Sequence, residues 1–172
     1  GLTKTNTGTL TLTGDNTYTG GTTVNAGILA LNNTTTSNTT IAGDGTIGTF
    51  DVTISGGTLR NDANEQIANN ASITMSSGAY SLNGATETID GFTNSGGTFT
   101  TGAGTLTGLG NTITWSGGTN TINDGGTVQD QHFDVSGGTN TVEGGATGGT
   151  LHVQSGGTGF EFTGTGTPNV TL

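Results

Sequence analysis

The sequence predicts an all-β chain wound as a right-handed, single-stranded parallel β-helix, with about eight coils of about 20 residues each. The first observation behind this prediction is a turn that recurs at that interval. Ser-Gly-Gly-Thr stands at 55–58, 95–98, 116–119, 136–139 and 155–158, and the variant at 76–79 fills the longer gap. A fixed period in this range is typical of solenoids, in which each repeat stacks on its neighbours to bury a core.

Composition is the second observation. The chain of 172 residues contains 35 glycines and abundant threonine, and only 27% of its residues are hydrophobic. Glycine and threonine are poor helix formers, whereas threonine favours strands and glycine favours turns. That hydrophobic content is low for a globular domain. It is sufficient for a narrow bore filled by one or two apolar side chains per strand.

The third observation is apolar alternation at period two, which places side chains on one face of a strand. The first strand of each coil ends at the turn and carries Val52 and Ile54, Ile73 and Met75, Phe92 with Asn94, Ile113 and Trp115, Phe133 and Val135, and Leu151 and Val153. The second strand follows the turn, with Leu59, Tyr80, Phe99, Asn120 and Asn140, then Leu82, Ile122 and Val142. A weaker third strand is indicated by Ile67, Ile89, Leu106 and Val128.

Three short strands per coil, joined by glycine-rich corners, fit a parallel β-helix, and the crossover rule for parallel strands makes it right-handed. An antiparallel β-sandwich is the alternative, but it does not require a constant step. In the parallel arrangement Asn120 would lie over Asn140 and form an amide ladder.

The net charge of the chain limits the classes of molecule that it can bind. Twelve acidic residues face only Lys4 and Arg60, which gives a net charge of −10. Such a surface repels phosphate backbones and anionic lipids, so we expect no nucleic-acid partner and no membrane insertion by this segment. The chain has no cysteine, which excludes disulfides and thiolate metal sites.

Residues 1–31 carry a more specific pattern. It consists of Gly8-Thr9-Leu10-Thr11-Leu12-Thr13-Gly14, the segment from Asn16 to Val24, Asn25-Ala26-Gly27 and Leu29-Ala30-Leu31. This pattern closely resembles the passenger-associated β-strand repeat of bacterial autotransporters. The resemblance implies a β-helical stalk exported to the surface or exterior of a Gram-negative bacterium. We expect one β-helical segment over 1–172, with the repeat at 1–31 and degenerate coils at 32–172, as an excerpt of a longer chain.

The expected function is a non-catalytic stalk of an adhesin-like surface protein. Its expected partners are flanking coils of the parent chain, or a second copy stacked end to end as in an extracellular filament; a host or matrix ligand is not identified. An ice-binding β-helix is one alternative, because a regular threonine array on adjacent coils resembles the faces of such proteins. The array consists of Thr98, Thr100, Thr119, Thr121, Thr139 and Thr141.

A polysaccharide-active enzyme is the other alternative, and it would need clustered carboxylates. The best cluster is Asp124, Asp130 and Asp134 near His132, and stacking of Phe133 on Leu151 would place Asp134 over His152. We interpret these acids as solvated turn residues, and the pairs Asp62 with Glu65 and Glu87 with Asp90 likewise. We expect no metal or cofactor, because nothing completes a ligand set around His132, His152 and Asp134, and Asp44 lacks the calcium nonapeptide.

Overall fold

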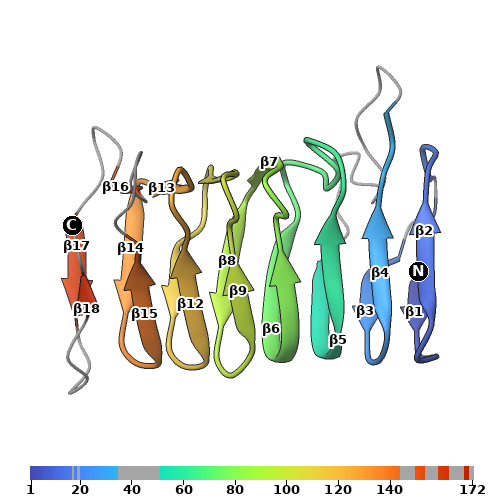
Figure 1. Ribbon diagram of the computed structural model, residues 1–172, viewed down its shortest axis with the longest axis horizontal. Helices are drawn as coiled ribbons and strands as arrows, with labels where there is room; N and C mark the ends of the chain where they lie inside the picture. The colour runs from blue at the N-terminus through green and yellow to red at the C-terminus, as the bar shows by residue number, and fades with distance from the viewer. Residues whose placement is uncertain are drawn as a thin grey trace.

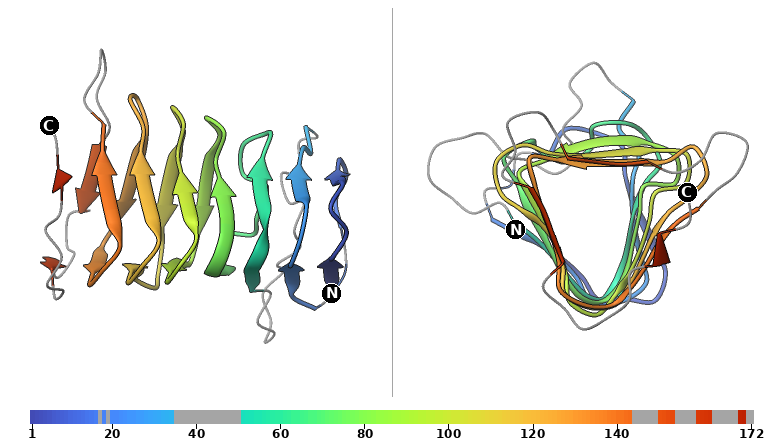
Figure 2. Two further views of the ribbon diagram at one scale, coloured as in Figure 1. Left: turned by 60° about the horizontal axis from the view of Figure 1, so that its bottom comes forward. Right: turned by 90° about the vertical axis from the view of Figure 1, so that its left-hand side faces the viewer.

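The computed structural model describes residues 1–16, 18, 20–34 and 51–143, together with the strand backbones at 150–153, 159–162 and 169–170. Every pairing between its strands is parallel, and the strands stack in successive layers along a rod (Figure 1). Seen down its long axis, the rod is triangular (Figure 2). The prediction of a parallel β-helix is therefore confirmed.

Three faces make up the triangle. The first face consists of β1 (Leu2–Lys4), β3 (Thr22–Val24), β8 (Gly91–Asn94), β11 (Ile113–Trp115), β14 (His132–Val135) and β17 (Gly159–Phe162). The second consists of β2 (Thr9–Leu12), β4 (Ile28–Leu31), β9 (Thr98–Thr100), β12 (Thr119–Ile122), β15 (Thr139–Val142) and β18 (Asn169–Val170). The third consists of β7 (Thr86–Ile89), β10 (Thr105–Gly108), β13 (Thr127–Asp130) and β16 (Thr150–Val153).

Two long strands join the first and second faces. The strands β5 (Val52–Asn61) and β6 (Ser72–Ser81) each run through the corner without interruption, and their pairing shifts register around Ser55. In these layers the predicted first and second strands are therefore one bent strand. In the layers of β8 to β16 the chain makes the three separate strands that the sequence predicts.

The winding step varies more than the sequence indicates. Ile113 pairs with Phe133, which is the predicted step, but Thr22 pairs with Val52, so the winding between them is much longer. Among the described residues, the terminal layers β1–β2 and β17–β18 contribute two strands each. Within the described strands, eight layers stack on the first face from β1 to β17, so the coil count differs only slightly from the expected one, and two of the windings between layers are longer than the repeat seen in the sequence.

The core runs along the bore as columns of stacked side chains. The apolar members of the predicted inward pairs on β5, β6, β8, β11 and β14 are all buried, and so are Leu59, Tyr80 and Phe99 on the second face. Aromatic rings fill the middle of the rod: the Phe99 ring lies 4.9 Å from that of Phe92, and Trp115 lies 4.7 Å from Phe133. Phe92 and Phe99 lie on adjoining faces of one winding, whereas Trp115 and Phe133 lie in successive layers of the first face, so ring contacts run both across the bore and along it.

The recurring Gly-Gly pair is explained by the corner between the first two faces. Gly118 has a φ of 68°, which L side chains rarely adopt, and a Cβ there would overlap the carbonyl oxygen of Gly97 in the preceding layer. A Cβ at Gly57 would likewise lie only 3.0 Å from the backbone of Ala26. Glycine is needed because consecutive corners nest closely.

Two sequence-based register assignments are wrong. Leu151 and Val153 lie in β16 on the third face, where Leu151 pairs with Val128, and not before a first-face turn. Phe133 pairs instead with Phe160 of β17. The winding that joins these two residues is longer than the one between Ile113 and Phe133, so the constant-step alignment fails at this end.

Candidate functional site

The predicted threonine array lies on the second face as expected. Thr98, Thr119 and Thr139 pair in successive layers, and so do Thr100, Thr121 and Thr141. The first column is exposed and the second is partly exposed, whereas the residues between them face the bore. We call these six residues the second-face threonine surface.

This surface ends on its N-terminal side at the layer of β6. Thr98 pairs with Ala79, Thr100 pairs with Ser81, and Ser81 in turn pairs with Arg60. The small side chain of Ala79 and the long guanidinium of Arg60 interrupt the repeating hydroxyl pattern. The regular array is therefore three layers long.

The first face carries a longer threonine column that was not singled out from the sequence as a surface. It consists of Thr3, Thr23, Thr53, Thr74, Thr93 and Thr114, each paired with the next. Asp134 follows Thr114, and Glu161 follows Asp134. The recurring Thr between two inward residues was visible in the sequence, but the long winding before Thr53 hid the continuation of the column to Thr23 and Thr3.

A shallow groove of about 650 Å³ adjoins the second-face threonine surface at the corner toward the third face. Its lining includes Asn83, Asn123, Asp124 and Glu143, with Gly102 between the two asparagines. The Gly102 amide donates to Asn123 Oδ1 at 2.8 Å, and Asn123 Nδ2 donates to Glu143 Oε2 at 3.3 Å. Two carboxylates, those of Asp124 and Glu143, make the groove acidic, and hydrogen bonds already join its residues along the rod axis.

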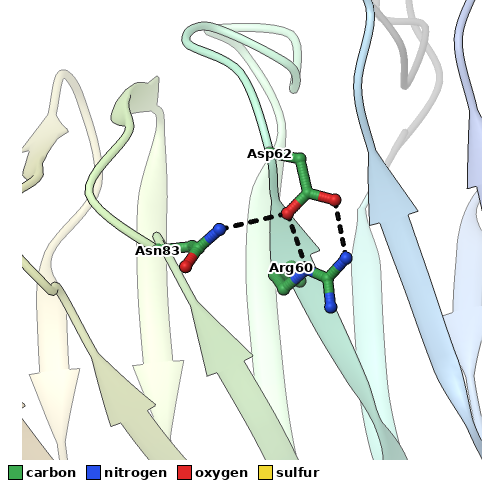
Figure 3. Close-up of polar contacts among 3 residues, drawn as sticks. All are labelled: Arg60, Asp62 and Asn83. Atoms are coloured by element: carbon green, nitrogen blue, oxygen red, sulfur yellow. Dashed lines mark hydrogen bonds and ion pairs between the residues drawn. The ribbon is translucent and has the colours of Figure 1, made fainter.

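The same corner begins with an ion pair (Figure 3). Arg60 donates to Asp62 through Nε at 2.6 Å and Nη2 at 2.7 Å, and Asn83 Nδ2 donates to Asp62 Oδ1 at 3.2 Å. The hydrogen bonds from Arg60 lower the pKa of Asp62. Asp62 is therefore a partner in a surface network and not a free loop acid.

The predicted carboxylate cluster is not brought together. Asp124 lies at the corner after the second face, Asp130 at the end of β13, and Asp134 on the outer side of β14. Asp134 pairs with Glu161 and His152 pairs with Gln129, so the predicted stacking of Asp134 over His152 is wrong. The side chain of His152 and the whole of Asp44 lie outside the described residues.

Asp130 is a buried residue and not a solvated turn acid. Its carboxylate occupies the space that a side chain at Gly108 would fill, and it accepts hydrogen bonds from the amides of Ile113 at 2.8 Å and Gln131 at 2.6 Å. Burial raises its pKa, and these amide donors and the nearby His132 oppose that rise. The carboxylate thus fastens the corner between the third and first faces.

Metal binding finds no support within the described ranges. Among those residues, no three His, Cys, Asp or Glu side chains gather where they could hold an ion. In the same part of the chain, no helix is long and apolar enough to cross a membrane. The second-face threonine surface and the adjoining groove remain the candidate sites.

The architecture defines a class: a parallel β-solenoid with flat, hydroxyl-rich faces. Residues 2–31 match the passenger-associated-transport-repeat family. They include β1 to β4, in which Leu10 pairs with Leu29 and Leu12 with Leu31. Residues 2–31 are thus an autotransporter passenger repeat, a type of repeat found in secreted or cell-surface proteins.

Curated relatives agree with this assignment. The chain is 47% identical over 62 residues to an extracellular serine protease of Serratia marcescens and 50% identical over 56 residues to a second protein of that name and organism. The matches cover 33% and 29% of this chain but only 6% and 5% of those proteins. No solved structure matches the chain.

Proposed function

We propose that the chain is a rigid, non-catalytic stalk within an autotransporter passenger, and that it displays or spaces an adhesive region at the bacterial surface. The observation that carries the proposal is the continuous parallel ladder of the first face, from β1 through β3, β5, β6, β8, β11 and β14 to β17. Main-chain hydrogen bonds along one axis make such a rod stiff. Flanking windings of the parent chain, or a second copy end to end, are its proposed partners.

The roles of the described acids support a non-catalytic stalk. Asp130 accepts main-chain hydrogen bonds, Asp62 pairs with Arg60, and Glu143 accepts from Asn123. Each carboxylate is engaged in holding its own corner or neighbouring layers together. The protease activity in the names of the relatives belongs to those proteins, of which this chain matches only a small part.

Removal of one winding tests the proposal. Deletion of residues 98–118 joins Gly97 to Thr119, which pairs with Thr98 in the next layer, so the register is kept. A stalk predicts a folded variant whose rod is shorter by about 4.8 Å in small-angle scattering. Release of reducing ends from bacterial polysaccharides by the intact chain, lost in Asp124→Asn with Glu143→Gln, would instead establish the enzyme alternative.

Ice binding is a second candidate function, and the stacking of the second-face threonine surface favours it. Pairing places hydroxyl and methyl groups at regular intervals in two directions. Thermal hysteresis in the intact chain, lost in Thr119→Tyr but kept in Thr74→Tyr on the first face, would support it. Absence of hysteresis in the intact chain would exclude it.

A further inference from the structure

Glu87 occupies a position in the hydrophobic core. It lies on β7 and pairs with Leu106, which in turn pairs with Val128. Its side chain is 0% exposed. The alternation Thr86-Glu87-Thr88-Ile89 gives Glu87 the same inward orientation as Ile89, so the sequence contained the signal, but the expectation of a loop acid was wrong.

Both carboxyl oxygens of Glu87 accept hydrogen bonds from neutral donors. The amide of Gln66 donates to Oε2 at 2.8 Å, the side-chain amide of Asn61 donates to the same oxygen, and the amide of Ile67 donates to Oε1 at 3.1 Å. These contacts fix the segment 61–67 against β7. These N–H donors favour the ionised form, but none of them carries a positive charge to balance it.

Neither the lysine nor the arginine of the sequence is placed to neutralise an ionised Glu87. Lys4 donates to the carbonyl oxygens of Asn6 and Ala26 in the first layers, and Arg60 is engaged by Asp62 on the outer surface. An isolated buried carboxylate is strongly disfavoured and takes up a proton instead. The titratable groups that interact with Glu87 are Glu65 and Tyr80, and neither is a cation at neutral pH.

Two buried polar atoms near Glu87 lack partners among the described residues. They are Oδ1 of Asn61, whose amide nitrogen binds Glu87, and the hydroxyl oxygen of Tyr80. Burial, and to a smaller extent the charges of Glu87 and Glu65, raise the pKa of Tyr80. An ionised Glu87 would add only acceptors to this environment, whereas the neutral acid adds a donor.

We propose that Glu87 is a proton-dependent lock of the core: the neutral acid fits the bore beside residues 61–67, and its ionisation places a buried charge there with no cation partner among the described residues, which destabilises this layer. Burial raises the pKa of Glu87 to about 8, with Glu65 contributing, while the Gln66, Ile67 and Asn61 donors oppose the rise. The lock connects to the passenger repeat side of the rod, since Gln66 Nε2 donates to Asn33 O at 3.1 Å and Asn33 Nδ2 donates to Asp15 Oδ1 at 2.6 Å.

The sign of the effect follows from linkage. A folded pKa of about 8, above the unfolded value of 4.5, means that the native state binds this proton more tightly. The contribution of Glu87 to stability is then fully present below pH 4.5 and is lost as the pH rises through about 8.

The test is the thermal midpoint of the 172-residue chain across this pH range. The wild type and the exposed control Glu143→Gln should show a midpoint that falls with rising pH, and Glu87→Gln should remove that fall. If Glu87→Gln does not fold, Glu87→Leu, which copies Leu106, takes its place. An infrared band of a protonated carboxylic acid at neutral pH, absent in the Glu87 variant, should accompany the result.

Two outcomes would overturn the lock. One is a Glu87 variant that keeps the wild-type pH dependence and the infrared band. The other is a wild-type midpoint that does not fall as the pH rises toward about 8, because ionisation of Glu87 would then not destabilise the fold.

Discussion

Asn120 donates a hydrogen bond of 2.8 Å from Nδ2 to Oδ1 of Asn140, the residue paired with it in the next layer. Asn94 donates to Asn120 Oδ1 at 2.7 Å, so the predicted two-residue ladder has three members. The ladder also binds the corners, because Asn120 Nδ2 donates to Gly117 O and Asn140 Nδ2 donates to Gly137 O. Asn94 comes from the first face, so the ladder joins two faces of the triangle.

Loss of the central asparagine should therefore be costly. We expect Asn120→Ala to lower the free energy of unfolding by about 1–3 kcal/mol, because Asn120 is fully buried and its removal leaves buried partners unsatisfied. Urea denaturation measures this change. Asn111→Ala, at an exposed residue bound to Asp90, is the control, with an expected change within about 0.5 kcal/mol. Equal losses in the two variants would contradict the buried ladder.

The corner glycines should not be equivalent to other glycines. Gly118→Ala should destabilise the rod by at least about 1–2 kcal/mol, because its φ of 68° is left-handed and a Cβ would overlap Gly97 O. Gly14→Ala is the matched control, since no atom lies within 4 Å of a Cβ there. Thermal unfolding of both variants checks the prediction, and a Gly118→Ala midpoint at or above that of Gly14→Ala would refute it.

Within the passenger repeat, two paired leucines should contribute different amounts to stability. Leu29 is 0% exposed whereas Leu10, its partner in the first layer, is 37% exposed. We expect Leu29→Ala to cost about 2–5 kcal/mol, as for other buried leucines, and Leu10→Ala to cost clearly less. Chemical denaturation of the two variants decides the point. A larger loss at Leu10 would show that the first layer is covered in solution.

The Arg60–Asp62 ion pair should contribute little to the free energy of unfolding. Its side chains are 35% and 22% exposed, and ion pairs at such positions contribute about 0–1 kcal/mol because solvent screens them. Since the pKa of Asp62 is lowered, this contribution is present above the ordinary carboxyl value of 3.8 and is lost as the pH falls below it. Acid titration of Asp62→Asn beside the wild type measures it. A loss above about 2 kcal/mol at neutral pH would indicate a buried role.

The sequence by itself determined the parallel solenoid and most of its core. Ser-Gly-Gly-Thr at a nearly constant step, with Val52 and Ile54 or Ile113 and Trp115 before it, was enough to place inward and outward residues. Backbone pairing stacks equivalent positions, so the alternation within a strand and the repeat of the turn together fix which side chains share a column. The threonine surface followed from the same two periods.

Only the tertiary structure decided the positions where the step changes and where polar residues are inside. The long windings from Thr22 to Val52 and from His132 to Gly159 depend on which strand the chain rejoins, and no local pattern specifies that. Asp130 is buried because Gly108 in the adjacent layer leaves room for it. Glu87 is accommodated because Asn61, Gln66 and Ile67, distant in sequence, present their N–H groups to it. Burial of a charged residue thus depends on partners that stacking supplies.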